Sequence, residues 1–308
     1  MLKRIILIAL LIGLLTACQS RVEVKEKPQV MVSLFPQYDI VRNIAKDKVD
    51  VDLFLPAGSE PHSYEPSAST LMKIVESDLF VYSSDELEPW VKRLVEGNAT
   101  ENLMVLDASS GISLLEADHE HEDEHEDEDE LAFDPHYWLD TQNMIIMSKT
   151  ILEALIQIDP ENETFYVNNA DTYVKELQVL DEMWIDLFEH ARLNQIIYGG
   201  HYAFGYLSHR FGLEIISPYS GYAPDAEPSA QALAGLMDIL AEKQINVIFY
   251  EELIDPRVAR IIAEQANVEI EVLHGAHNLS PEQKEADWTY ISIMDDNISK
   301  LKKALDYE

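Results

Sequence analysis

Two sets of short apolar runs, separated by one long helical stretch, constrain the fold of this chain more than any other feature. The first set comprises residues 29–35, 49–55, 79–83 and 102–108. The second set comprises residues 195–199, 213–218, 246–251 and 268–274. Most runs are almost continuously apolar, which is typical of parallel strands covered on both faces, and helical patterns such as Pro36–Lys46 and Ser229–Lys243 fall between them. The sequence therefore predicts an α/β fold with two mainly parallel sheets and flanking helices.

The stretch between the two sets predicts a long helix over residues 159–191. Asp159-Pro160 is a favourable N-cap and first-turn pair, and apolar residues then recur at helical spacing as far as Phe188. Such a helix is about 45 Å long at 1.5 Å per residue, which suits a rigid rod that joins two lobes. The alternative is two shorter helices with a break near Asn168-Asn169.

The two halves of the chain also resemble each other. The segment Glu65-Pro66-Ser67-Ala68 recurs as Glu227-Pro228-Ser229-Ala230. A helical pattern, an apolar strand and an acid–proline pair follow each copy in the same order. We therefore expect two similar lobes, with residues 29–158 in the first and residues 192–308 in the second.

The N-terminus predicts export and lipid anchoring. A short basic segment precedes the apolar run Ile5–Leu15, which is too short to cross a bilayer but suits a signal peptide. The run ends in Leu15-Thr16-Ala17-Cys18, which resembles the lipobox of bacterial lipoproteins, and Cys18 is the only cysteine. We expect a signal peptide at 1–17 and a lipidated tether at 18–28, so that the protein is extracytoplasmic and anchored to the cell membrane. An ordinary signal peptide with an incidental cysteine is the alternative.

The charge of the chain restricts its partners. It has 57 acidic and 22 basic residues, for a formal net charge of -35, which repels phosphate backbones and excludes a nucleic-acid binder. Much of this charge lies in the acidic loop at residues 116–130, which also holds His119, His121 and His125. The loop is either a solvated charged spacer or a weak collector of metal ions.

Four other histidines occur in distinctive contexts, namely His62, His136, His201 and His277. His62, His201 and His277 follow predicted strands, at the sheet edge where open α/β folds bind ligands. The first lobe contributes two of the four and the second lobe the other two, so a ligand held by all four lies between the lobes. Four imidazole nitrogens favour Zn²⁺ over Mn²⁺ or Mg²⁺, which prefer oxygen ligands.

From about residue 29 to its C-terminus, the chain resembles the zinc/manganese-type substrate-binding lipoproteins of metal-importing ABC transporters. The motifs that carry this resemblance are Glu60-Pro61-His62-Ser63-Tyr64-Glu65-Pro66, Leu87-Glu88-Pro89-Trp90-Val91, Asp134-Pro135-His136-Tyr137-Trp138-Leu139-Asp140, His201-Tyr202-Ala203-Phe204-Gly205-Tyr206-Leu207 and Asp225-Ala226-Glu227-Pro228-Ser229.

The resemblance implies two α/β lobes, a long joining helix and one metal ion between the lobes. It also implies ligands at His62, His136 and His201, and His201 stands where manganese-type members usually carry a carboxylate. The fourth position is commonly acidic in the family, and His277 aligns with it here.

We expect His277 rather than His274 to be the fourth ligand, because His274 lies in or at the end of a predicted strand, where the pleat fixes its direction. A different fourth ligand, such as Glu282, Asp287 or water, is the alternative.

The function implied is the capture of extracytoplasmic Zn²⁺ and its delivery to the permease and ATPase subunits of an ABC zinc importer, by a monomeric protein that is not an enzyme. Four protein ligands leave no open coordination position for catalysis. The alternatives are transport of manganese or another divalent metal, a surface adhesin, and a zinc hydrolase with Glu60 as its base. The hydrolase is disfavoured because the chain has no HExxH motif.

Overall fold

The computed structural model describes residues 27–97, 102–117, 131–217, 230–243, 245–253 and 255–308. The predicted signal peptide 1–17, Cys18 and nearly all of the tether 18–28 lie outside these residues, as do His119, His121 and His125 of the acidic loop. At the start of that loop, Glu116 forms a β-bridge with Phe133. Within the described ranges, no helix has the length and apolar character needed to cross a membrane.

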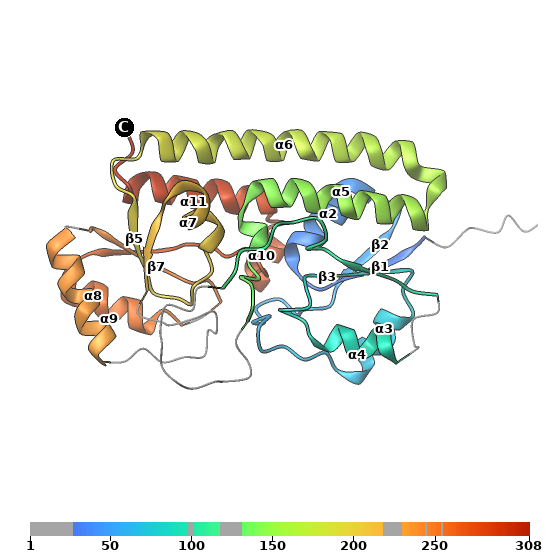
Figure 1. Ribbon diagram of the computed structural model, residues 1–308, viewed down its shortest axis with the longest axis horizontal. Helices are drawn as coiled ribbons and strands as arrows, with labels where there is room; N and C mark the ends of the chain where they lie inside the picture. The colour runs from blue at the N-terminus through green and yellow to red at the C-terminus, as the bar shows by residue number, and fades with distance from the viewer. Residues whose placement is uncertain (1–26, 98–101, 118–130, 218–229, 244, 254) are drawn as a thin grey trace, which may run out of the picture.

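The structure has two lobes that follow each other along the chain (Figure 1). The elements of the first lobe are β1 (Gln29–Val32), α2 (Phe35–Ala45), β2 (Asp50–Leu53), α3 (Ala68–Val75), β3 (Leu79–Tyr82), α4 (Trp90–Glu96), β4 (Met104–Asp107), η1 (Tyr137–Leu139) and α5 (Thr141–Ile158). The linking segment comprises η2 (Pro160–Asn162) and α6 (Glu163–His190). The elements of the second lobe are β5 (Gln195–Tyr198), α7 (Gly205–Phe211), β6 (Glu214–Ile216), α8 (Ala230–Lys243), β7 (Val247–Tyr250), α9 (Arg257–Ala266), β8 (Glu269–Val272), α10 (Pro281–Glu285) and α11 (Tyr290–Ala304).

Each lobe contains a four-stranded parallel sheet. The strand order is β2-β1-β3-β4 in the first sheet and β6-β5-β7-β8 in the second, so the two lobes share one topology. The predicted α/β fold with two similar lobes is confirmed. All eight predicted runs form strands, but the strands are shorter than the apolar runs. In the first run, for example, Ser33 and Leu34 leave the sheet because Phe35 already begins α2.

The end of β8 corrects one expectation about the site. This strand ends at Val272, so His274 lies in the following loop and the pleat of the strand does not direct its side chain. The sequence reasoning placed His274 in or at the end of the strand because the apolar pattern continues through Leu273. The choice between His274 and His277 therefore depends on their contacts.

The linking helix α6 is continuous over 28 residues, from Glu163 to His190. The alternative with a break near Asn168-Asn169 is not observed. Asn169 instead donates a hydrogen bond from Nδ2 to the carbonyl oxygen of Ile44, 2.9 Å away, so this polar residue ties α6 to the end of α2. In Figure 1 the helix extends along most of the molecule and lies over both lobes.

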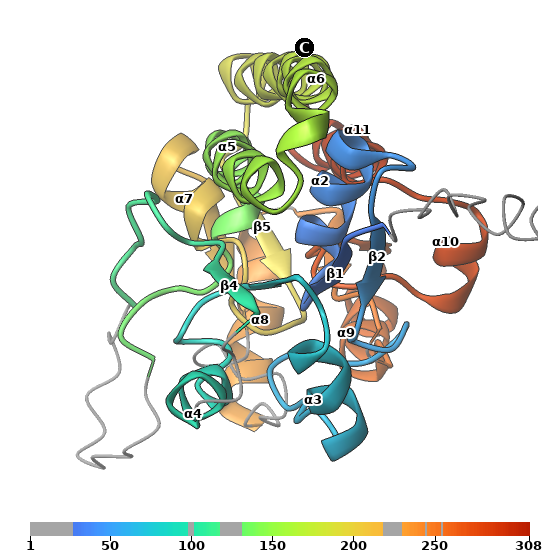
Figure 2. The same cartoon turned by 90° about the vertical axis from the view of Figure 1, so that its right-hand side faces the viewer.

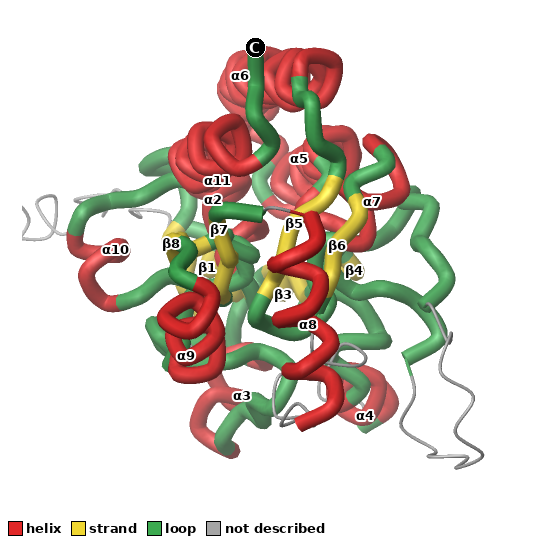
Figure 3. The backbone as a smooth tube through the Cα atoms, turned by 90° about the vertical axis from the view of Figure 1, so that its left-hand side faces the viewer, coloured by secondary structure: helices red, strands yellow, loops and turns green. Residues whose placement is uncertain are grey.

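One continuous core lies beneath α6 and holds the two lobes together. Helices α2, α5 and α11 pack against α6 and separate it from the sheets (Figures 2 and 3). The core extends from Val30 in β1 through Leu177 and Trp184 of α6 to Leu301 in α11. Two smaller clusters lie on the other faces of the sheets, under α3 and α4 in one lobe and under α8 and α9 in the other. The main core fixes how the lobes face each other, and thus where their loops meet.

Candidate metal site

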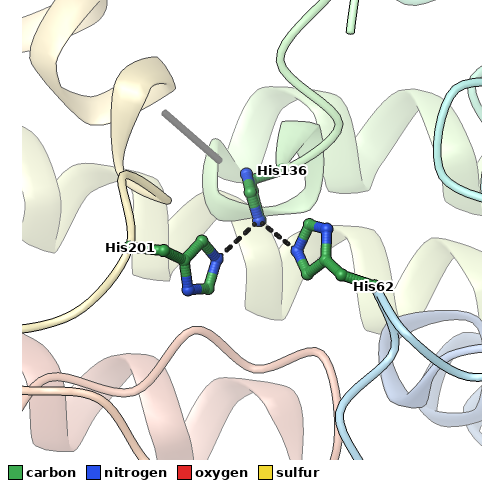
Figure 4. A group of neighbouring side chains, drawn as sticks. All are labelled: His62, His136 and His201. Atoms are coloured by element: carbon green, nitrogen blue, oxygen red, sulfur yellow. Dashed lines mark hydrogen bonds between the residues drawn. The ribbon is translucent and has the colours of Figure 1, made fainter. Parts of the chain in front are cut away.

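Three of the four predicted histidines meet between the lobes. His62 lies in the loop after β2, His136 lies just before η1, and His201 follows β5 (Figure 4). The Nε2 atom of His136 is 3.1 Å from the Nε2 atom of His62 and 3.1 Å from that of His201. Ligand atoms of all three side chains lie within 4.8 Å of one another. Both lobes therefore contribute nitrogen atoms to one small volume.

The spacing of these nitrogens suits a tetrahedral zinc ion. Zn–N bonds of about 2.0–2.1 Å at tetrahedral angles put the ligand nitrogens about 3.3 Å apart. The observed separations of 3.1 Å are close to this value. Two neutral imidazole nitrogens that both carry lone pairs repel each other at such a distance, whereas a proton or a cation between them makes the contact favourable.

Two carboxylates orient the histidine rings. Asp134 Oδ1 lies 2.8 Å from Nδ1 of His136, and Glu251 Oε2 lies 2.8 Å from Nδ1 of His201. In each pair the Nδ1–H group donates to the carboxylate, which leaves the lone pair on Nε2 free to bind a cation. Metal-binding histidines are commonly held in this way, and the carboxylate also makes the imidazole a stronger ligand.

Two glycines provide room for these carboxylates. A Cβ atom at Gly200 would lie 2.8 Å from Glu251 Oε2, and a Cβ atom at Gly205 would collide with the Asp134 carboxylate. The Gly200 position directly precedes His201, and Gly205 begins α7. The local sequence around His201 is therefore fitted to the second layer of the site as well as to the ligand itself.

Burial and neighbouring charges shift the pKa values of the histidines. Burial, together with the other histidines, lowers the pKa of His62 and of His136 well below 6.5. For His201, burial also acts to lower the pKa, but the hydrogen bond and the charge of Glu251 outweigh it and the pKa is raised. His62 and His136 are thus neutral, and able to bind a cation, over the physiological pH range.

The structure places His277 beside the three histidines but in a different group. Ligand atoms of His277, Glu60 and Glu251 lie within 4.8 Å of one another. Nδ1 of His277 lies 3.5 Å from Glu252 Oε1, and its buried Nε2 has no hydrogen-bond partner among the described residues. A buried imidazole nitrogen without a hydrogen bond is costly unless something binds it, so His277 stays the predicted fourth ligand.

His274 has a different environment from His277. Its Nδ1 lies 3.1 Å from Oε1 of Glu252 and 2.9 Å from the backbone nitrogen of Ala276, and its Nε2 lies 3.3 Å from Oε1 of Gln283. Both ring nitrogens of His274 therefore already have polar partners, whereas Nε2 of His277 has no hydrogen bond among the described residues. The other predicted alternatives, Glu282 and Asp287, are exposed.

The sequence reasoning missed the residues that support the ligands. The motif around His136 does not by itself assign a role to Asp134, although a carboxylate two residues before a histidine suits a local hydrogen bond. Glu251 and Glu252 directly follow β7, at the same sheet edge as His201. Their position after a strand is the sequence feature that could have marked them as residues of the site. Their partners come from other strands, which local patterns do not identify.

The sequence as a whole matches the family model described as "Zinc-uptake complex component A periplasmic", over residues 30–304. It is 37% identical over 283 residues to the high-affinity zinc uptake system protein ZnuA of Bacillus subtilis (strain 168), which covers 91% of this chain and 88% of that protein. It is 32% identical over 300 residues to the zinc-binding lipoprotein AdcA of Streptococcus pneumoniae serotype 4, covering 96% of this chain but only 59% of AdcA.

Solved structures give the same result. The Zn(II)-bound ZnuA-like domain of Streptococcus pneumoniae AdcA superposes with a TM-score of 0.77 at 31% identity and covers 91% of this chain and 99% of that domain. The laminin-binding protein Lmb of Streptococcus agalactiae, described as bifunctional with adhesin and metal-transporting activity, superposes with a TM-score of 0.79 at 27% identity, covering 91% and 100% of the two chains. With its two lobes, linking helix and interlobe histidines, the chain belongs to the family of periplasmic zinc-uptake component A proteins.

Proposed function

We propose that this protein captures Zn²⁺ outside the cytoplasm and delivers it to an ABC-type permease for uptake. His62, His136 and His201 bind the ion, and His277 completes the tetrahedron. The relatives named as zinc-uptake and zinc-binding proteins support this proposal. The extracytoplasmic location follows the periplasmic family, and the lipid anchor at Cys18 follows the lipobox-like sequence.

The observation that carries the proposal is the geometry of the Nε2 atoms. They come from both lobes and lie at zinc-ligand spacing, and carboxylates hold two of the rings in the ligating tautomer. With His277 as the fourth ligand, such a site has no open coordination position, which suits a carrier and not an enzyme. We propose that the chain is a binding protein that passes its ion to the permease and ATPase subunits of a zinc importer, and that it acts as a monomer.

Elemental analysis and chelator competition test this function. The mature protein, purified without added metal, is expected to contain zinc as its tightest-bound metal, with the affinity lost in the His136→Ala variant. His190→Ala is the matched control, because His190 is exposed at the far end of α6 and should leave zinc binding unchanged. Manganese or another divalent metal in the tight site would contradict the assignment of zinc.

A surface adhesin is a second candidate, favoured by the structural likeness to Lmb. In that case the full chain is expected to bind laminin-coated surfaces in a saturable manner. Binding that is equal on laminin and on albumin would reject this candidate, and neither result affects the zinc proposal.

A further inference from the structure

Beside the three histidines lie three side chains that each carry one buried atom without a hydrogen bond. These atoms are Glu60 Oε2, Glu251 Oε1 and His277 Nε2, and none has a hydrogen bond to any residue that the structure describes. Ligand atoms of the three side chains lie within 4.8 Å of one another. Burying such atoms without hydrogen bonds is expensive, and a metal cation satisfies carboxylate oxygens and an imidazole nitrogen together.

The three residues differ in how far they reach toward solvent. The side chain of Glu60 is 18% exposed, whereas those of His277 and Glu251 are each 2% exposed. Glu60 comes from the first lobe, on the loop that carries His62, and its Oε1 accepts a hydrogen bond from the backbone N–H of His62 at 3.2 Å. The group therefore extends from a partly exposed carboxylate, on the loop that carries His62, to two side chains that are as buried as His201.

The group also shares residues with the inner site. Glu251 binds Nδ1 of His201 through Oε2, while its Oε1 is one of the three atoms without a hydrogen bond. Nε2 of His277 lies 3.8 Å from Glu60 Oε2. An ion beside Glu60 is thus already next to His277, the predicted fourth ligand of the inner site.

We propose that Glu60, Glu251 and His277 form an outer cation position that Zn²⁺ occupies on its way to and from the three histidines. This inference rests on the proposed zinc-binding function. At this outer position, one imidazole and two carboxylates replace part of the water shell of the ion. The ion then moves to the Nε2 atoms of His62, His136 and His201. His277 is a ligand in both positions, so the ion exchanges two carboxylates for three imidazoles without returning to water.

A transient position of this kind has a kinetic signature. It lowers the barrier equally for arrival and departure, so its loss slows both rates and leaves their ratio unchanged. A ligand of the final site behaves differently, because its loss speeds dissociation and weakens equilibrium binding. The two roles are therefore separable by measuring rates and affinity on the same variant.

The fluorescence of Trp138 provides a readout of the inner site. Its ring centroid lies 5.5 Å from that of His136, so Zn²⁺ at the three histidines should change its emission. The full chain, stripped of metal, is mixed with Zn²⁺ in a stopped-flow instrument to obtain the association rate. Mixing the zinc-loaded chain with excess EDTA gives the dissociation rate, and chelator competition gives the Kd.

We expect Glu60→Gln to slow association and dissociation by about tenfold each while the Kd changes by less than about threefold. Glu60→Asp, which keeps the carboxylate, should retain most of both rates. Glu65→Gln is the matched control for the loss of one negative charge, because Glu65 is exposed on the same loop, and it should behave like the wild type.

Wild-type rates in Glu60→Gln would overturn the proposed outer position. Equal slowing in Glu65→Gln would also overturn it, because the effect would then come from long-range electrostatic attraction of Zn²⁺ to any negative charge. Faster dissociation with a weaker Kd would make Glu60 a ligand of the final site and would also overturn it. If the wild type itself gives no zinc-dependent Trp138 signal and no tight Kd, the proposed function fails first.

Discussion

At the scale of single residues, acidic side chains determine which ring nitrogen is left for a metal in three of the four predicted ligands. Asp134 and Glu251 take the Nδ1–H groups of His136 and His201, and Glu252 lies 3.5 Å from Nδ1 of His277. The Nε2 atoms are then left for the cation. This arrangement makes zinc binding depend on protonation, because a protonated imidazole has no lone pair to offer.

Zinc affinity should fall as the pH falls. Glu251 raises the pKa of His201 above 6.5 despite burial, so His201 takes up a proton first and competition begins near or above pH 6.5. Burial lowers the pKa of His62 and His136, so these two protonate only at lower pH and the decline then steepens. Chelator competition at a series of pH values measures this, and an affinity that stays flat from about pH 7.5 to 5.5 would point to carboxylate ligands instead.

His277→Ala should weaken zinc binding more than His274→Ala does. A structural zinc site yields about 10–16 kcal/mol shared among four ligands, so losing one ligand costs roughly 100-fold or more in affinity. Both ring nitrogens of His274 already have polar partners in Glu252, Ala276 and Gln283, so its loss should have a smaller effect. Competition against a chelator compares the two variants directly, and a greater loss in His274→Ala would make the assignment of His277 wrong.

At the scale of elements, the turn between β3 and α4 contains a buried carboxyl group. Oε2 of Glu88 accepts hydrogen bonds from Ser33 Oγ at 2.8 Å and from the backbone N–H of Ser83 at 2.6 Å. Burial nevertheless raises the pKa of Glu88 to about 7. The folded protein therefore holds the carboxyl proton of Glu88 more tightly than the unfolded chain does, in which this group has a pKa near 4.5.

The sign of this shift predicts how Glu88→Gln changes stability. The wild type loses stability as the pH rises from about 4.5 to 7, by about 3 kcal/mol at 1.36 kcal/mol per pKa unit. Gln cannot ionise and keeps one acceptor oxygen for Ser33 and Ser83. Denaturant unfolding of the metal-free protein should thus show equal stabilities at about pH 4.5 and a gain of up to about 3 kcal/mol for the variant at pH 8.

Glu96→Gln is the control for Glu88→Gln, because Glu96 is exposed at the end of α4. Its stability relative to the wild type should not change with pH. If Glu88→Gln also shows no pH-dependent gain, then Glu88 is already ionised at little cost and the argument from burial is incorrect.

The elements could be located from the sequence, but their ends could not. Apolar runs mark the strands because both sheets are covered on both faces, and residues such as Leu79 and Ile248 are fully buried. The runs continue past the strands because the residues that follow, such as Leu34 and Leu273, are buried in the same core. Apolar character reports burial and not hydrogen bonding, so it does not show where a strand ends.

At the scale of the whole molecule, the shared core beneath α6 determines which loops meet. The motifs, together with the places of His62 and His201 after strands, predict His62, His136 and His201 as ligands, and the structure brings these three side chains together. Their grouping apart from His277, and the roles of Glu251 and Glu252, could not be predicted, because they depend on how the lobes are docked. That docking is set by the packing of α2, α5 and α11 against α6, which no local pattern specifies.

The tight site should not need the acidic loop. Ala117 N–H donates to the carbonyl oxygen of Ala132 at 3.0 Å, so the residues that flank the loop are held together and a short Gly-Ser linker can join them. Replacing residues 118–130 in this way removes His119, His121 and His125. Isothermal titration with zinc should still give one tight equivalent and should lose only the weaker ones, because the interlobe site is preformed. Loss of the tight equivalent would show that the loop supplies a necessary ligand.

X-ray absorption at the zinc edge tests the central claim most directly, which is that histidines from both lobes hold one zinc ion. The full chain, loaded with one equivalent of zinc, should give about four nitrogen ligands at 2.0–2.1 Å and the outer-shell scattering of several imidazole rings. The His136→Ala variant should show one imidazole fewer or no ordered site. A shell made mainly of oxygen atoms, without imidazole scattering, would contradict the account.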